Sequence, residues 1–372
     1  MKPHSSMFKS VIGVASLSLI LVVILAPSGH ASSDVLWSQQ EVSAPSINAV
    51  FRFSPDGELV ATGRRETNDV YIRSASDGTL VRVLNGKNND ANALAFSPDS
   101  QLLVTGTGGP GVGLSLNLWG VADGVRLVGR IPAHSNGTTG VAISPDGQLV
   151  ATCGFHDRTI MLWHLPDMTR AGAVTNSDPD LGGTALFVRA IAFSPDGQLL
   201  ATGDSNNIKL RRVSDFSIVR TMAQSAAHDY VTLAFSPDGQ ELVAGLTDLD
   251  VTYGRCADCS VKLWKVSDGT LLRTFYSGAG ELRYTKVDFS ADGQTVGAGF
   301  TIEPDEVTGV IQFWDTRNGS SFFIDYQPSP VHAFTISPSG KFYGYMLADG
   351  TVAVAPMPVS SQSADDYGSR NR

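Results

Sequence analysis

The feature that most constrains this chain is a four-residue turn that recurs along it. Four copies read Ser-Pro-Asp-Gly and three are altered copies of the same pattern. The seven copies begin at Ser54, Ser97, Ser144, Ser194, Ser236, Ser290 and Ser337. The serines are therefore 43, 47, 50, 42, 54 and 47 residues apart. A period of about 40–50 residues indicates an array of equivalent units, a class that includes the β-propellers.

Each repeat contains four short apolar or β-branched segments. Residues 190–193 lead into the turn at Ser194, and residues 199–203 follow it. Segments such as residues 159–163 and 270–275 supply a third and a fourth strand. Runs of this kind, separated by Gly, Asp and Ser, predict strands joined by hairpins, and Pro and Gly suit a type I turn. We therefore predict an all-β fold, a seven-bladed β-propeller of four-stranded antiparallel blades.

The strand before each turn has the composition of an inner strand. The third and the first residue before every turn serine are apolar, and most residues between them are alanine. A strand covered by a blade on each side is expected to be apolar on both faces. Arg52 and Asp288 are exceptions to this pattern. We expect a channel with few polar groups, which gives a channel metal site little to use.

The two ends of the chain are expected to complete the ring together. The seventh repeat ends at residues 351–355 without a fourth strand, and residues 34–38 provide one. Closing the ring in this way removes the open sheet edges, and Trp37 should pack the closure. Residues 32–356 are thus predicted to form the propeller. The polar tail, residues 357–372, is predicted to be disordered.

Residues 1–31 have the layout of a secretory signal. Lys2 and Lys9 precede or flank an apolar run over residues 11–26, and Gly29-His30-Ala31 offers small residues for cleavage. An uncleaved membrane anchor is the alternative, although about 16 apolar residues fall just below the ~17–25 that span a bilayer. In both cases we expect the body to be exported, to the periplasm, the medium or the cell surface.

The charge balance argues against nucleic acid as a partner. The chain has 27 basic and 36 acidic residues, a formal charge of −9. Removal of residues 1–31 deletes two lysines and no acid, so 25 − 36 gives −11. Phosphate-backbone binding rests on clustered Lys and Arg, and the sequence has no such run.

The third strand of four repeats ends in tryptophan after an apolar residue: Trp119, Trp163, Trp264 and Trp314. Asp315 completes one full Trp-Asp pair. With the repeat length and the turns, the chain resembles the WD-repeat family over residues 34–356. Blades one, four and seven depart from the family pattern because Arg73, Arg211 and Ala355 replace the tryptophan.

The resemblance also implies a set of hydrogen bonds within a blade. In the family a His, a Ser or Thr, a turn Asp and the third-strand Trp are linked. Blade three fits this pattern best, with His134, Thr152, Asp157 and Trp163. We assign these four residues a structural rather than a catalytic role, because the repeat pattern accounts for them.

The three cysteines have different predicted roles. Cys256 and Cys259 flank a predicted hairpin turn, and in an exported protein a local disulfide is the favoured interpretation. A redox motif, which needs a helix amino terminus, and a zinc site, which needs two further ligands, are the alternatives. Cys153 lies on a predicted second strand and is expected to be a buried free thiol.

One face of the propeller is predicted to bind a partner. The long insertions at residues 107–113, 172–187, 246–259 and 300–309 should all emerge on one side, called here the loop face. The Ser-Pro-Asp-Gly turns emerge on the opposite side, called here the turn face. Binding residues concentrate on variable loops held by a rigid scaffold. The expected partner surface, at the channel mouth, consists of Arg189, Tyr230, Arg283, Tyr284 and His332. Ordinary solvated loop residues are the alternative interpretation.

Taken together, these features predict a non-enzymatic protein-interaction scaffold. We expect a monomer with a protein or peptide partner on the loop face, no catalytic, cofactor or metal residues, and membrane contact only through an uncleaved residue 1–31 segment. Two alternatives stay open. One is a propeller enzyme of the hydrolase or lactonase class with a metal in the central channel, and the other is a sensor of a small ligand or glycan. The fold alone does not decide among them.

Overall fold

The computed structural model describes the following residues: 35–41, 49–64, 69–85, 91–107, 116–135, 137–154, 157–178, 184–185, 188–204, 207–223, 229–247, 260–275, 281–303 and 308–359. The predicted signal segment, residues 1–31, and the predicted disulfide, Cys256 with Cys259, lie outside this set. Among the described residues there is no helix of the length and apolarity needed to cross a membrane.

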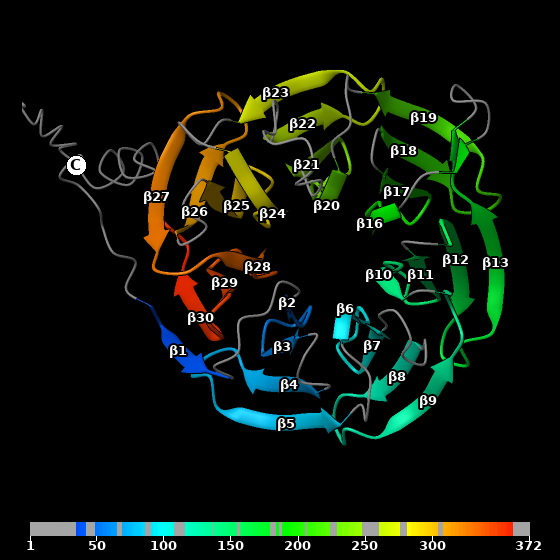
Figure 1. The fold of residues 1–372 in the computed structure, drawn as a ribbon, viewed down its shortest axis with the longest axis horizontal. Coiled ribbons are helices and arrows are strands. Elements are labelled where there is room, and N and C mark those ends of the chain that lie inside the picture. The colour runs from blue at the N-terminus through cyan, green and yellow to red at the C-terminus, as the bar shows by residue number, and fades with distance from the viewer. Residues whose placement is uncertain are drawn as a thin grey trace, which may run out of the picture. The chain divides into compact units, whose positions relative to one another are not determined.

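Seven four-stranded antiparallel sheets are arranged as the blades of a ring, which confirms the predicted fold (Figure 1). From the inner to the outer edge, blade one contains β2 (Ala49–Phe53), β3 (Leu59–Arg64), β4 (Asp69–Ser74) and β5 (Leu80–Asn85). Blade two contains β6 (Ala91–Phe96), β7 (Leu102–Thr107), β8 (Leu116–Gly120) and β9 (Arg126–Ile131). Blade three contains β10 (Thr138–Ile143), β11 (Leu149–Gly154), β12 (Thr159–His164) and β13 (Arg170–Thr175).

The second half of the chain repeats the arrangement. Blade four contains β16 (Val188–Phe193), β17 (Leu199–Asp204), β18 (Asn207–Arg212) and β19 (Ile218–Ala223). Blade five contains β20 (Asp229–Phe235), β21 (Glu241–Thr247), β22 (Val261–Lys265) and β23 (Leu271–Phe275). Blade six contains β24 (Glu281–Phe289), β25 (Thr295–Glu303), β26 (Gly309–Asp315) and β27 (Ser321–Gln327). Blade seven contains β28 (Val331–Ile336), β29 (Phe342–Leu347), β30 (Thr351–Pro356) and the amino-terminal β1 (Trp37–Gln40).

Strand β1 closes the ring, as the sequence predicts. It pairs antiparallel with β30, with Trp37 opposite Val354. The Trp37 ring is buried against blade one, where its Nε1 donates a hydrogen bond of 2.8 Å to the Ala75 carbonyl. Gly78 lies directly under the ring, and a Cβ at that position would come within 2.6 Å of it. Trp37 is therefore one of the side chains that join the first blade to the last.

The tail begins differently from the prediction. Residues 357–372 were expected to be disordered, but Met357 is half-buried against blade seven and its backbone N–H donates to the Lys341 carbonyl at 2.8 Å. The propeller contacts therefore extend past residue 356. Residues 360–372 lie outside the described part of the chain.

The recurring turn is explained by hydrogen bonds between its own serine and aspartate. In the first copy the Ser54 Oγ donates to the Asp56 carboxylate at 2.5 Å and accepts from the Leu59 N–H at 2.9 Å. The same carboxylate accepts from the Glu58 N–H at 3.0 Å. The glycine at the fourth position has a φ of 77°, a conformation that a residue without Cβ adopts at little cost. All seven turn serines are buried, so each hydroxyl needs hydrogen-bond partners within the protein, and the turn supplies them.

An altered turn is compensated in blade two. Ser100 takes the place of the usual glycine and keeps the left-handed conformation, with a φ of 61°. Its Oγ accepts a hydrogen bond of 3.1 Å from the Asp56 N–H of blade one. The substitution therefore adds a contact between two neighbouring turns that partly offsets its backbone strain.

The apolar core is divided among the interfaces between blades. Seven clusters of buried residues occur in the described structure, and each combines side chains of two adjacent blades, including the pair formed by blades seven and one. Every blade is therefore stabilised on both sides. This arrangement fixes the inner strands around the axis, where the candidate site lies.

Candidate functional site

The inner strands of all seven blades surround a central channel with two described cavities. One has a volume of about 100 Å³ and is lined mainly by the first half of each strand, from Ala49 in β2 to Phe334 in β28. Since the inner strands run from the loop face to their turns, this cavity lies toward the loop face. The second has a volume of about 340 Å³ and is lined mainly by the ends of the same strands, close to Pro55 and Pro145 of the turns.

Three basic side chains line the first cavity, which we call the cationic chamber. Arg52 comes from β2, Arg189 from β16 and Lys286 from β24, so they belong to blades one, four and six. Arg52 is exposed to the channel, and the other two are half-buried. The expectation of a channel with few polar groups was therefore wrong.

Lys286 is the residue that the sequence analysis missed. It stands four residues before its turn serine, where the other blades carry only Val, Ala, Gly or Thr. A comparison of that column would have found it. The strand β24 is also irregular at this point, since its register with β25 shifts between Arg283 and Lys286.

The charges in the channel affect one another. Burial, together with the positive charges of Arg52 and Arg189, lowers the pKa of Lys286 to about 8. Arg52 is open to the channel but removed from bulk water, and this desolvation lowers its pKa, which the charge of Asp288 partly opposes. The side chains thus lie close enough for their charges to interact, in surroundings poor in water.

Asp288 is the acidic counterpart, and it lies in the second cavity. Its carboxylate accepts hydrogen bonds from the Thr335 Oγ1 at 2.7 Å, the Ile336 N–H at 3.0 Å and the Phe289 N–H at 2.9 Å. Burial raises the pKa of Asp288, while these hydrogen bonds and the charge of Arg52 oppose the rise. The carboxylate therefore links blade six to blade seven.

The donors in the channel do not suit a metal cation. Among the residues that the structure describes, no group of three His, Cys, Asp or Glu side chains is placed to hold one. The cationic chamber instead presents ammonium and guanidinium groups, which donate hydrogen bonds and attract anions.

Four residues of the predicted partner surface lie on three consecutive blades. Arg189 is the second residue of β16, Tyr230 the second of β20, and Arg283 and Tyr284 the third and fourth of β24. All four therefore stand at the loop-face ends of inner strands. His332, on β28, is only 4% exposed, so it belongs to the interior of blade seven and not to an accessible surface.

Extra structure also occurs at the loop face of this sector. Strands β24 and β25 are 9 residues long and pair as far as Glu281 with Glu303, whereas the inner strands of the other blades have 5 to 7 residues. A two-stranded hairpin, β14 (Ser177–Asp178) with β15 (Thr184–Ala185), is inserted before blade four. On the turn face every blade has a four-residue turn, four of them Ser-Pro-Asp-Gly and three of them altered copies.

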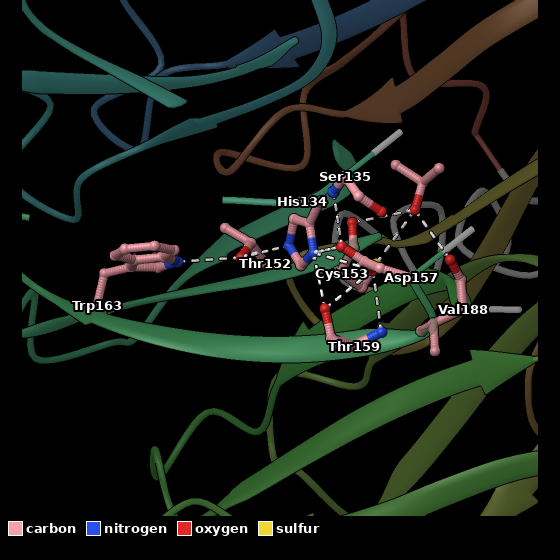
Figure 2. Close-up of polar contacts among 9 residues, drawn as sticks. His134, Ser135, Thr152, Cys153, Asp157, Thr159, Trp163 and Val188 are labelled. Atoms are coloured by element: carbon pink, nitrogen blue, oxygen red, sulfur yellow. Dashed lines mark hydrogen bonds and ion pairs between the residues drawn. The ribbon is translucent and has the colours of Figure 1, made fainter. Parts of the chain in front are cut away.

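Figure 2 shows the four network residues of blade three brought together in a line. The Trp163 Nε1 donates to the Thr152 Oγ1 at 3.0 Å, and the same hydroxyl lies 2.9 Å from the His134 Nε2. The His134 Nδ1 lies 3.1 Å from the Asp157 Oδ2. With the histidine proton on Nδ1, the hydroxyl donates to Nε2 and every donor in the line has an acceptor.

Asp157 also orders the loop around it. Its carboxylate accepts from the Ser135 N–H at 2.9 Å and from the Thr159 N–H at 3.1 Å. Burial alone would raise the pKa of Asp157, but the hydrogen bonds from His134, the Ser135 N–H and the Thr159 hydroxyl help to lower it to about 2. The blade network is thus a structural unit buried within the sheet and does not open into the channel.

Blade one replaces this network with charged residues. Arg73 occupies the tryptophan position, opposite Val60, and Thr62 occupies the position of Thr152. The Glu41 Oε1 accepts from the Arg73 Nε at 3.0 Å and from the Thr62 Oγ1 at 2.8 Å. Glu41 therefore links the second-strand threonine to the residue at the tryptophan position, as part of a hydrogen-bond network that takes the place of the histidine network in blade three.

Blade four uses a third solution. The Arg211 Nη2 donates to the Asn176 Oδ1 at 2.9 Å, and the Asn176 Nδ2 donates to the Asp204 Oδ2 at 3.0 Å. Lys209 completes the group through an ion pair of 3.0 Å with the same carboxylate oxygen. Arg73 and Arg211 could be identified from the sequence, but their partners Glu41 and Asn176 could not. His134 lies ten residues before its turn serine, and neither Glu41 nor Asn176 has that spacing.

Comparison with known proteins agrees with the repeat structure. The family model described as "WD domain, G-beta repeat" matches residues 74–112, 125–164, 181–211 and 218–265. In the solved structures, the chain is similar to the β-propeller domain of Cps50 (Swd1) from Myceliophteria thermophila, with a TM-score of 0.70 and 17% identity. That similarity covers 87% of this chain and 100% of the other, and at this identity it bears on the fold alone.

The curated relatives share a modest sequence identity with this chain, and the chain matches less than half of the length of each. The protein hir1 of Schizosaccharomyces pombe is 28% identical over 176 residues, which are 42% of this chain. Telomerase protein component 1 of Rattus norvegicus is 27% identical over 266 residues, or 71% of this chain, and a WD repeat-containing protein of Synechocystis sp. is 27% identical over 157 residues, or 42%. The chain matches only 18%, 9% and 41% of their respective lengths.

Proposed function

Because this chain belongs to the WD-repeat family of β-propellers, we propose that it is a non-enzymatic scaffold whose loop face binds a protein or peptide partner. The observation that carries the proposal is the asymmetry between the two faces. The turn face consists of short turns of uniform length, whereas the loop face bears the long β24–β25 ladder and the β14–β15 hairpin. Rigid scaffolds carry their binding residues on such variable elements.

The proposed partner surface is the loop-face sector of blades four to six. Tyr230, Arg283 and Tyr284 stand at the ends of β20 and β24, and aromatic and Arg side chains are the usual anchors of protein interfaces. Arg189 lies at the boundary of this surface with the channel. We further propose that a single closed ring acts as a monomer, because closure gives blade seven the fourth strand that it would otherwise have to take from a second chain.

We also propose that the scaffold works outside the cytoplasm, after removal of residues 1–31. The support for this is the sequence layout of that segment: a positive start, an apolar run and a small-residue exit. An intact mass beginning at Ser32 in protein from the native host is the expected result. A mass that includes residues 1–31 would show an anchored protein instead.

Site-specific crosslinking tests the partner surface. A photoreactive residue is placed at Tyr230 on the loop face and, as a matched control, at Gln198, an exposed residue beside a turn of blade four. We expect a discrete crosslinked species from position 230 only, and we expect its yield to fall when Arg283→Ala is added. Equal yields from the two faces, or a yield that Arg283→Ala leaves unchanged, would contradict the proposal.

A further inference from the structure

We propose that the cationic chamber is a binding site for a small oxyanion, the carboxylate, phosphate or sulfate group of a ligand, held by Arg52, Arg189 and Lys286. The site stands apart from the scaffold role, because it lies inside the ring and is built from inner-strand side chains. Three observations lead to it: the convergence of the cations, the imbalance of charge around them, and the size of the cavity.

The three cations approach the axis from different sides of the ring. Arg52, Arg189 and Lys286 belong to blades one, four and six, and all three line the same cavity. The backbone at two of them is held by strand pairing, since Arg52 pairs opposite Ala61 and Lys286 opposite Gly299, while Arg189 lies at a register shift of β16. A ligand that meets these side chains therefore finds a largely preformed site, which reduces the entropy lost on binding.

The described residues that line the chamber include three cations and no carboxylate. Within the described part of the chain Lys286 forms no ion pair, and the charge of Asp288 acts on Arg52. Three hydrogen bonds already hold Asp288 in the second cavity. The excess stands out in a protein whose formal charge is −9. A bound anion would relieve the mutual repulsion, and the charge-assisted hydrogen bonds it accepts are the strong ones.

The cavity is small. Its volume of about 100 Å³ gives room for a few water molecules or for one oxyanion group. Apolar side chains form much of the wall and weaken screening, which strengthens the attraction between the anion and the cations. They are Phe51, Leu94, Val141, Ile191, Leu233 and Phe334.

The test is calorimetric titration of the full propeller with sodium sulfate, phosphate and acetate, at constant ionic strength maintained with chloride. We expect saturable binding of at least one ion. Lys286→Met should weaken it at least tenfold, and Lys286→Arg, which keeps the charge, should retain it. The matched control is Lys265→Met, which removes an exposed lysine of blade five and should leave the affinity unchanged.

A second arm identifies the source of the oxyanion. The tripeptide Gly-Glu-Gly, with both termini blocked, presents a side-chain carboxylate as a protein partner would. Binding of the free ions supports a small-molecule ligand, and Lys286-dependent binding of the peptide alone supports a carboxylate from a polypeptide. If neither the ions nor the peptide binds, or if all four proteins respond alike, the site does not exist. The scaffold proposal would be unaffected, since its crosslinks do not involve Lys286.

The pH dependence provides a further readout. Sulfate keeps its charge throughout the range, so a change in its affinity with pH reports on the protein. The Lys286 pKa of about 8 in the free protein means that sulfate affinity should fall as the pH rises above that value. In Lys286→Arg the affinity should stay constant over the same range. A parallel fall in both proteins would show that another group governs binding.

Discussion

The charged network of blade one gives the sharpest prediction about stability. The Arg73 side chain is 11% exposed and the Glu41 side chain is fully buried, and their ion pair is 3.0 Å long. Removing one partner of a buried pair typically costs about 3–5 kcal/mol, because the other charge remains buried without compensation. Glu41→Ala also takes the acceptor from the Thr62 hydroxyl, worth about 1 kcal/mol. We expect Glu41→Ala to lower the free energy of unfolding by about 4–6 kcal/mol.

Arg73→Ala should cost a similar amount, but the double variant should cost much less than the sum. Replacing both members of a buried pair removes the uncompensated charge, so the coupling energy should reach about 2 kcal/mol or more. The matched control is the exposed pair of Lys265 and Asp268, whose side chains are 50% and 48% exposed. Its double-mutant cycle should give less than about 1 kcal/mol.

Equilibrium denaturation by urea provides the measurement. Circular dichroism and tryptophan fluorescence should give coincident transitions, which shows that the propeller unfolds as one unit and that the free energies are comparable. If the coupling in the blade-one cycle is no larger than that in the exposed cycle, Glu41 does not substitute for the network histidine. The interpretation of blade one would then be wrong.

Three further predictions concern other parts of the ring. Asp157→Asn should cost about 2 kcal/mol at pH 7, because the folded pKa of about 2 lies below the unfolded value of 3.8. The stability that Asp157 contributes is present above about pH 4 and is lost as the pH falls toward 2. The urea midpoints of the wild type and the variant should therefore converge near pH 2. A gap that stays constant with pH would contradict the lowered pKa of Asp157. Lys286→Met should stabilise the ligand-free protein by about 1–2 kcal/mol at pH 7, because it removes a charge that burial and two neighbouring cations disfavour. This figure allows for screening by the solvent in the channel. Since the folded pKa of about 8 lies below the unfolded 10.5, wild-type stability should rise between these pH values, whereas that of the variant should not. Trp37→Ala should cost about 3 kcal/mol or more and speed amide exchange in β30, while exchange in β13 on the far side of the ring stays unchanged; uniform acceleration would argue against a local closure.

The fold could be predicted from the sequence because its main signal is local. The serine hydroxyl of each turn bonds groups no more than five residues away, as Ser54 does with Asp56 and Leu59. Local requirements of this kind keep a serine at the start of every turn and similar residues after it. The closing strand was also predictable, since the seventh repeat lacks a fourth strand and the amino terminus supplies one.

The site was harder to predict because its parts come from different blades. Arg52, Arg189 and Lys286 are far apart in the sequence and meet only around the axis. The blade-one network was missed for a related reason, since Glu41 reaches Arg73 from outside the repeat register. His332 shows the opposite error: its place near the channel suggested exposure, but the packing of blade seven buries it.

The pairing of β1 with β30 has a consequence for how the protein is made. Trp37 and Val354 are among the first and last residues of the propeller, so their pairing has nearly the largest sequence separation possible in this chain. Contacts of this kind form late, because the chain between them must already be ordered. During synthesis, strand β1 must therefore wait unpaired until β30, the last strand of the chain, is available to pair with it. A chaperone that holds the amino terminus would shorten the interval in which an unclosed ring could pair with a second one.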